Sequence, residues 1–87
     1  EKELVADLKF PKGDVLFTAQ EKEKRNQDLV RATRAGNLEK IKFKIIFEDG
    51  DGLKQVYTTI WATTEVNILL KRGVPIPIHR IHSVKIA

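Results

Sequence analysis

The chain has 87 residues, of which 41% are hydrophobic and 32% are charged, a composition typical of one small folded domain. The length excludes a multidomain enzyme, and the apolar content excludes a disordered tail. Because cysteine is absent, a disulfide scaffold and a cysteine-based zinc site are also excluded. A chain without thiols suits a reducing compartment, and we expect a cytoplasmic protein. The formal net charge of +4 permits an anionic partner without requiring one.

Positive charge is concentrated in the C-terminal two thirds of the chain. Residues 1–28 hold six Lys/Arg and seven Asp/Glu, a net charge of −1, whereas residues 29–87 hold ten and five, a net charge of +5. The chain begins at Glu1 and contains no methionine, so we expect it to come from a longer gene product. Since no apolar run approaches the roughly 20 residues of a membrane-spanning helix, we expect a soluble protein without a membrane partner.

The first predicted element is a short strand. Apolar residues recur at every second position from Leu4 to Phe10, which is the period of a strand, and residues 11–14 (PKGD) are typical of a turn. Residues 15–17 form either another short strand or the lead-in to a helix. These observations assign residues 1–17 to an N-terminal strand and turn.

A helix is predicted over residues 18–36. Thr18 is followed three residues later by Glu21, which is the spacing of a capping box, and Gly36 with Asn37 provides the stop. Residues 21–28 contain no apolar side chain, so we expect the first half of the helix to lie in solvent. The residues expected to dock on a core are Leu29, Val30, Ala32 and Ala35.

Residues 41–86 predict strands joined by tight turns. Between residues 41 and 48, Lys42 and Lys44 alternate with apolar residues, which indicates a strand with one buried face. The sequence DGDG at residues 49–52 predicts a hairpin loop. Residues 53–63 are mixed on both faces and indicate one bent strand that serves two halves of a sheet. Three more strands are predicted at residues 68–71, 74–78 and 83–86, with a tight turn at 79–82.

This order of elements resembles that of an SH3-like or Sm-like small barrel. Residues 59–64 (TIWATT) and 70–81 (LKRGVPIPIHRI) are similar to small bacterial proteins of uncharacterised function. We therefore expect a single domain that is mainly β, or α+β by count of elements. It would be a five-stranded SH3/Sm-like small barrel over residues 41–86, preceded by the N-terminal helix. In Sm-like proteins such a barrel implies RNA binding and assembly into rings.

Two prolines bear on whether this domain could assemble into an Sm-type ring. Pro75 and Pro77 are two residues apart in a predicted strand, so both missing N–H groups lie on one edge. Because the other edge is occupied by the strand at residues 68–71, the edge without donors should face outward and resist the addition of a strand. The sequence therefore favours a monomer or a weak oligomer over an Sm-type ring.

The sequence predicts neither catalysis nor a metal or cofactor. It has no nucleophile elbow, no glycine-rich phosphate loop and no His-Glu-x-x-His motif. His79 and His82 are three residues apart, a spacing that metal ligands use, but without a third ligand we interpret them as turn residues. The loop at residues 49–52 resembles the start of a calcium loop, yet Leu53 and Ile60 stand where later oxygen ligands are needed.

A cationic patch is the one feature that favours a function. If the loops gather at one end of the barrel, basic residues there could contact phosphates. Two aromatic residues on the long strand could stack with bases, or they could belong to the core. The candidate nucleic-acid-binding residues are Lys42, Lys44, Lys71, Arg72, Arg80, Tyr57 and Trp61.

Two hypotheses follow from these observations. The first is a noncatalytic module that binds nucleic acid, RNA in particular, through the basic barrel surface. The second is a protein-interaction or scaffold domain that uses the exposed helix or a barrel edge. Neither hypothesis requires a cofactor.

Overall fold

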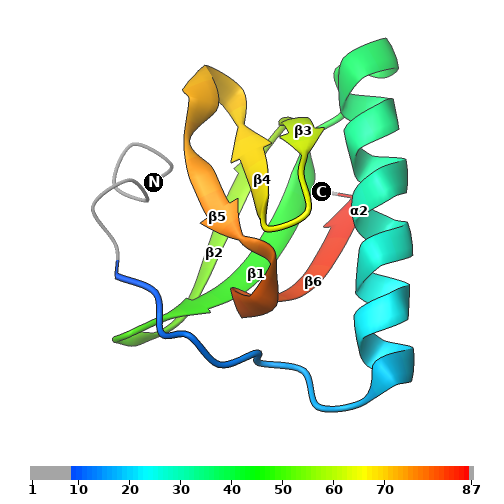
Figure 1. Ribbon diagram of the computed structural model, residues 1–87. Coiled ribbons are helices and arrows are strands. Elements are labelled where there is room, and N and C mark those ends of the chain that lie inside the picture. Colours follow the sequence, from blue (N-terminus) through cyan, green and yellow to red (C-terminus); the bar gives the residue numbers. More distant parts are fainter. Residues whose placement is uncertain (1–8, 87) are drawn as a thin grey trace.

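The computed structural model describes residues 9–86, in which one long helix precedes six short strands (Figure 1). No helix among these residues is both long and apolar enough to cross a membrane. The elements are α2 (Ala19–Glu39), β1 (Phe43–Asp49), β2 (Gly52–Thr58), β3 (Ile60–Thr63), β4 (Asn67–Leu70), β5 (Pro75–Pro77) and β6 (Ile81–Ile86), with short 3-10 helices η1 (Lys71–Gly73) and η2 (Ile78–Arg80).

The strands form two three-stranded antiparallel sheets, ordered β2–β1–β6 and β3–β4–β5. Thr59 separates β2 from β3 and carries the chain from one sheet into the other. The single strand predicted over residues 53–63 is therefore two strands, β2 and β3, which belong to separate sheets. The sheets do not close on each other within residues 9–86, so the architecture is an α+β domain of one helix and two sheets.

Strand alternation builds the core from the inner faces of both sheets. In β1 every second residue, from Phe43 to Asp49, is buried, which confirms the predicted alternation. The side chains of Ile45 and Phe47 are almost fully enclosed, and Ile60, Ile68 and Ile76 enter the same core from the second sheet. The residues between the buried ones, Lys44, Ile46 and Glu48, are only partly buried and lie on the outer side of the first sheet.

Helix α2 begins as the sequence predicts. Thr18 is the N-cap, its hydroxyl accepts from the Glu21 backbone N–H at 3.1 Å, and the Glu21 carboxylate accepts from the Thr18 N–H at 3.1 Å. Both halves of the capping box are therefore present.

We expect Thr18→Ala to lower the free energy of unfolding by about 1 kcal/mol, because an N-cap hydroxyl bond is lost. Thr18→Ser retains a hydroxyl and is the matched control, expected to unfold close to the wild type. Urea denaturation followed by circular dichroism measures both. Equal stabilities for the alanine and serine variants would contradict a capping role for Thr18.

The predicted end of the helix at Gly36 is wrong. The helix continues to Glu39 and ends where Lys40 adopts a left-handed conformation with φ 56°, its N–H donating to the Gly36 carbonyl. Gly36 is buried within the helix because the backbone of β3 passes beside it. A Cβ atom at Gly36 would lie 2.6 Å from the Ile60 carbonyl oxygen. The glycine allows close approach here and does not mark a helix stop.

Helix α2 packs against β3 and β6 with a face that the sequence predicts only in part. Leu29 and Ala32 are buried as expected, but Val30 is 55% exposed, which corrects its assignment to the docking face. The expectation that the first half of the helix lies in solvent is wrong at Arg25. This arginine is only 6% exposed, because Asp14 neutralises it from the segment before the helix.

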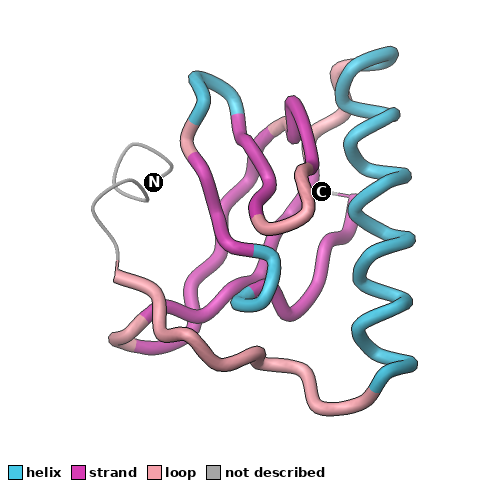
Figure 2. Tube along the Cα trace, in the orientation of Figure 1, coloured by secondary structure: helices cyan, strands magenta, loops and turns pink. Residues whose placement is uncertain are grey.

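The segment before α2 runs as a loop across the domain (Figure 2). The strand predicted from Leu4 to Phe10 falls largely on residues 1–8, outside the described residues, and residues 9 and 10 are not in a strand. Residues 15–17 are the lead-in to the helix. Four contacts from three segments, the β1–β2 turn, α2 and η2, hold the loop. Gly50 N–H donates to Lys9 O, Val15 N–H donates to His79 O, Asp14 pairs with Arg25, and Arg80 Nη1 donates to Gly13 O.

The edge without donors on β5 faces outward, as predicted. Leu70 N–H donates to Val74 O and Ile78 N–H donates to Val66 O, so the backbone groups of residues 74 and 78 face β4. Because neighbouring strand residues point to opposite edges, the nitrogens of Pro75 and Pro77 face away from β4. Among the described residues, β5 pairs with β4 alone.

Candidate nucleic-acid interface

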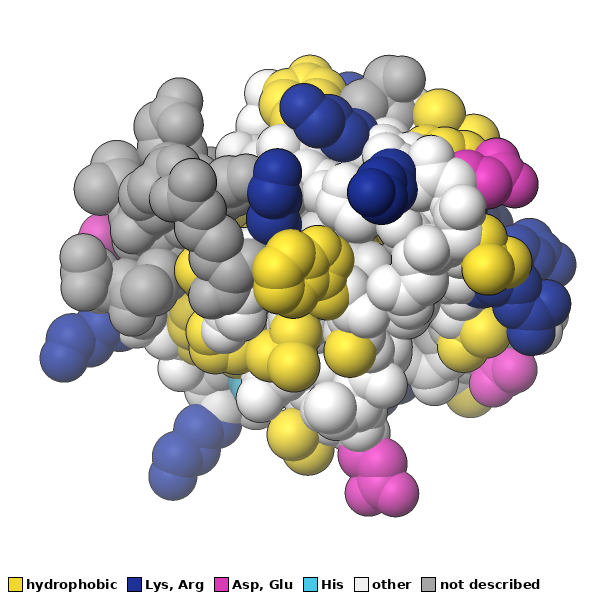
Figure 3. All heavy atoms as spheres, turned by 90° about the horizontal axis from the view of Figure 1, so that it is seen from above, with side chains coloured by type: hydrophobic (Ala, Val, Ile, Leu, Met, Phe, Trp, Pro, Cys, Tyr) yellow, Lys and Arg dark blue, Asp and Glu magenta, His cyan; other side chains and the backbone are white. Residues whose placement is uncertain are grey.

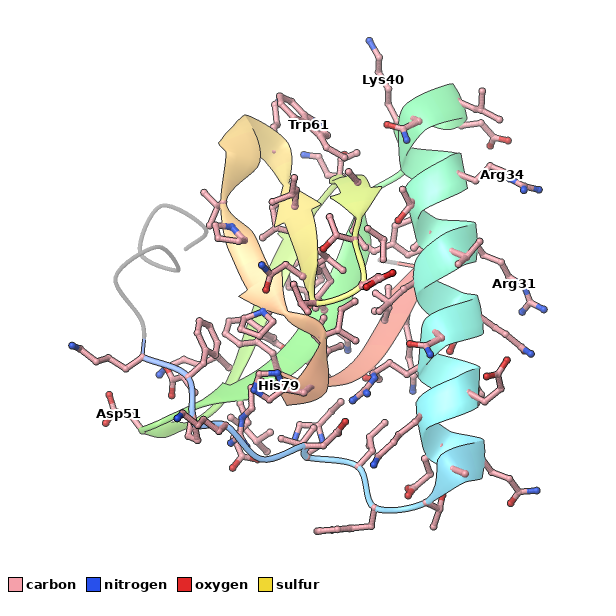
Figure 4. All side chains as sticks on the ribbon, in the orientation of Figure 1. Arg31, Arg34, Lys40, Asp51, Trp61 and His79 are labelled. Carbon is pink, nitrogen blue, oxygen red and sulfur yellow. The ribbon has the colours of Figure 1, made fainter. Side chains whose placement is uncertain are left out.

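An open groove of about 590 Å³ lies where the C-terminal end of α2 meets the bend between the two sheets. Figure 4 shows Lys40 and Trp61 at this end of the molecule, with Asp51 at the opposite end. Three segments far apart in the sequence contribute to the groove, and its lining residues are Gly36, Asn37, Lys40, Lys42, Thr59, Trp61 and Lys71.

The exposure of Trp61 follows from the local structure of β3. Ile60 is fully buried, so the next residue points to the other side of the strand, and Trp61 is 49% exposed. The pairing of β3 with β4 also shifts register between Ile60 and Ala62, which leaves Trp61 as the extra residue of a bulge. A bulge changes the direction of a side chain, so the indole is turned out of the core and into the groove.

Three lysines surround the indole from three different elements. Lys40 is the C-cap of α2, Lys42 precedes β1, and Lys71 begins η1. All three are exposed, and none forms an ion pair with another residue of the described chain. No carboxylate of the part of the chain that the structure describes lines the groove. Figure 3 views this end and shows lysine and arginine side chains around hydrophobic ones, with acidic side chains toward the margin. The groove is therefore locally cationic.

The structure brings together three of the residues that the sequence predicts for nucleic-acid binding: Lys42, Lys71 and Trp61. Arg72 follows Lys71 within η1. Lys44 and Tyr57 are paired across β1 and β2 on the outer face of the first sheet and do not line the groove. Both aromatic residues are nevertheless exposed, which rules out the core alternative for each of them.

Arg80 is a correction to the predicted patch. It is 8% exposed, and its guanidinium is engaged on three sides. Nε donates to Glu48 O at 3.0 Å, Nη1 donates to Gly13 O at 2.7 Å, and Nη2 lies 3.5 Å from the Glu48 carboxylate. Arg80 therefore joins the N-terminal segment to β1, and it does not belong to an exposed cationic surface.

The two histidines have separate partners. His79 Nε2 lies 2.8 Å from Pro11 O, and His82 Nε2 lies 3.0 Å from a Glu48 carboxylate oxygen. No group of three or more His, Asp or Glu side chains in the described residues is arranged to hold a metal ion. These contacts place both rings in the packing of the N-terminal segment and β1.

Sequence reasoning missed Lys40 and Asn37. Both fall after the predicted helix end at Gly36, where no pattern in the sequence gives the direction of a side chain. In the structure the last turn of α2 carries them to the groove. Alternation along a strand gives no signal for Lys40, because its backbone is left-handed and β1 begins only at Phe43.

Comparisons with models of protein families, with curated proteins and with solved structures found no match for this chain.

Proposed function

We propose that this domain is a noncatalytic module that binds single-stranded nucleic acid, RNA in particular, in the groove around Trp61. The observation that carries the proposal is a half-exposed indole bordered by three lysines, which pair with no acidic side chain among residues 9–86 and share the lining with none of these acidic side chains. Lysines at such a site neutralise phosphates, and an exposed aromatic ring stacks with a base.

The proposed ligand is single-stranded because stacking on Trp61 requires a base that is free of its own neighbours. Bases of a duplex are already stacked and paired, whereas those of single strands can turn out onto aromatic side chains. Asn37 and Thr59 add an amide and a hydroxyl to the same groove. Such groups can form hydrogen bonds with the edge of one base.

The order of elements supports this proposal by analogy. Counting β2 and β3 as one bent strand, the chain runs through a helix, four strands, a 3-10 turn and a last strand, the order of the SH3-like and Sm-like barrels. We propose that the domain is a variant of that fold in the cytoplasm. Fold analogy favours binding over catalysis without identifying the ligand, so the groove residues carry the assignment.

Titration with a short single-stranded RNA tests the proposal, because Trp61 is the only tryptophan and reports directly on the groove. We expect indole fluorescence to change on binding and affinity to fall steeply with salt. Replacing Lys40, Lys42 and Lys71 together by glutamine should reduce the salt slope of log K by about 2, since each phosphate contact on a single strand contributes about 0.7.

The matched control replaces Lys12, Lys24 and Lys85 by glutamine. This variant has the same net charge as the groove variant, but its three changes lie outside the groove. We expect it to bind nearly as the wild type does, whereas Trp61→Ala should lose about 1–3 kcal/mol of binding free energy. Absence of binding at low salt, or equal losses in the two lysine variants, would count against a specific site.

A protein-interaction role is the second candidate, and a separate surface favours it. Val30 and Leu38 are exposed on α2 and line a shallow pocket of about 450 Å³ with Thr33, Arg34 and Thr63. An amphipathic segment could dock on such a surface. If the wild type binds no RNA while Val30→Glu abolishes capture of a protein partner, this second candidate replaces the first.

A further inference from the structure

The outer edge of β2 differs from the other three sheet edges in residues 9–86. β3 and β6 are both packed against α2, and β5 carries Pro75 and Pro77 on its outward side. β2 pairs with β1 on one side, and no described strand pairs with its other side. An open edge without proline offers unpaired N–H and C=O groups to another strand.

The hydrogen bonds of neighbouring residues show which groups of β2 face this edge. Glu48 O accepts from Arg80 Nε, so the backbone of Glu48 faces away from β2. Backbone groups alternate along a strand, so the odd-numbered residues of β1 bond to β2. Their partners in β2 are the even-numbered residues 52 to 58. The backbone groups of residues 53, 55 and 57 therefore point outward. The backbone of Thr59 points to the same outer edge, where its carbonyl accepts from the Lys71 N–H.

We propose that two copies of this chain pair through β2 in an antiparallel, two-fold symmetric register centred on Gln55. Gln55 of one copy then faces Gln55 of the other, and Leu53 faces Tyr57. The outward groups of residues 53, 55 and 57 from both copies form up to about six backbone hydrogen bonds. The result is one continuous sheet of six strands, β6–β1–β2 followed by the same strands of the second copy in reverse.

This register is self-complementary. Leu53 and Tyr57 are 66% and 54% exposed in a single copy, and pairing places each of these apolar side chains against the other. Lys54 faces Val56 of the second copy, and its ammonium is already bound to the Asp49 carboxylate at 2.6 Å. No two like charges of β2 therefore lie directly opposite each other.

The hairpin tip adds charge complementarity. Asp51 is exposed at the tip of the β1–β2 hairpin (Figure 4). In the proposed register the pairing ends before Thr59, because Lys71 of the same copy already occupies the edge there. The hairpin tip of one copy therefore ends next to Lys71 of the other. An acidic tip thus approaches a basic residue at both ends of the interface. The interface is otherwise separate from the groove, which neither Leu53 nor Gln55 lines.

Single-cysteine variants test the register, since the chain has no cysteine of its own. In the Gln55→Cys variant the two Cα atoms would be about 5.5 Å apart, within the range of a disulfide. We expect this variant to form a covalent dimer under mild oxidation. Leu53→Cys on the same strand would place its two sulfurs about 13 Å apart and should remain monomeric on a denaturing gel. Gln27→Cys, exposed on α2, controls for random collisions.

Sedimentation velocity tests the pairing without cross-linking. We expect the wild type to dimerise as its concentration rises, and Gln55→Thr to do the same because it retains the N–H group. Gln55→Pro removes an outward N–H without breaking the ladder to β1, so it should stay folded by circular dichroism and remain a monomer. A wild type that is monomeric at millimolar concentration, dimerisation of Gln55→Pro, or equally fast cross-linking of Leu53→Cys would each overturn the proposal.

Discussion

Replacing Gly36 by alanine is expected to destabilise the domain by about 2 kcal/mol, the reverse of the usual stabilisation of up to about 1 kcal/mol for this change within a helix. The Cβ would lie 2.6 Å from the Ile60 carbonyl oxygen and 3.0 Å from the Thr59 methyl group. The nearest of these atoms belongs to the backbone of β3, so it cannot move aside by rotation of a side chain. Relief requires α2 to shift away from β3, at the cost that accompanies overpacking.

Urea denaturation of Gly36→Ala beside Asn37→Ala measures this effect. Asn37 is the next residue of the same helix and is exposed, so its replacement should leave stability within about 0.5 kcal/mol of the wild type. Because Gly36 and Thr59 both line the groove, Gly36→Ala should also shift the emission of Trp61 in the folded state. A Gly36→Ala variant as stable as the wild type would show that α2 and β3 separate at little cost.

Replacing Asp14 by alanine is expected to cost about 3 kcal/mol, because it leaves a buried guanidinium without its counter-charge. Arg25 Nη1 and Nη2 each donate to one Asp14 carboxylate oxygen at 2.9 Å, and Nη1 also donates to Ile81 O at 3.2 Å. The pair connects the N-terminal segment, α2 and β6 in one place. Asp28→Ala is the control, since Asp28 pairs with exposed Lys24 and Arg31 side chains, whose contribution is about 0.5 kcal/mol or less.

The same pair makes stability depend on pH. Hydrogen bonds from Arg25, with a further one from the Leu16 N–H, lower the pKa of Asp14 from 3.8 to about 2. Since the pKa of the folded state lies below that of the unfolded state, the ionised carboxylate stabilises the fold above pH 4. This contribution, on the order of 2 kcal/mol, is lost as the pH falls from about 4 through 2.

Subtracting the unfolding free energy of Asp14→Asn from that of the wild type between pH 2 and pH 6 isolates this contribution. The difference should be largest at pH 6 and shrink as the solution is acidified. A difference that stays constant over this range would mean that Asp14 does not titrate with the lowered pKa described above.

The sequence predicts the features that depend on neighbouring residues alone. The capping box at Thr18, the alternation of β1, the hairpin loop at residues 49–52 and the outward edge of β5 all follow from local patterns. The end of α2 could not be predicted from local patterns. Gly36 is a glycine because α2 passes close to the backbone of Ile60, which lies 24 positions further along the chain. A glycine near the end of a helical pattern otherwise indicates a C-terminal cap.

The sequence predicts only part of the candidate site, because contacts between distant residues also decide which basic side chains are exposed. Lys42, Lys71 and Trp61 come together because β3 and η1 meet at the bend between the two sheets. In the sequence nothing distinguishes Arg80 from the exposed lysines, because it too is a basic residue beside a predicted strand. Its burial depends on acceptors in the segment at residue 13 and in β1, which no local pattern reveals. Arg25 is misassigned in the same way, because its neighbours in the helix are charged while its partner Asp14 lies outside the helix.

The attachment of the N-terminal segment has a consequence for the order of folding. Its bonds from Arg80 to Gly13 and between His79 and Pro11 span 67 and 68 positions, and that from Arg25 to Ile81 spans 56. A ribosome therefore releases Pro11, Gly13 and Arg25 long before it makes the residues that hold them. Closing loops of this length carries an entropic cost before any contact is gained, which slows folding. The segment before α2 can thus be fixed only after η2 and β6 have been made.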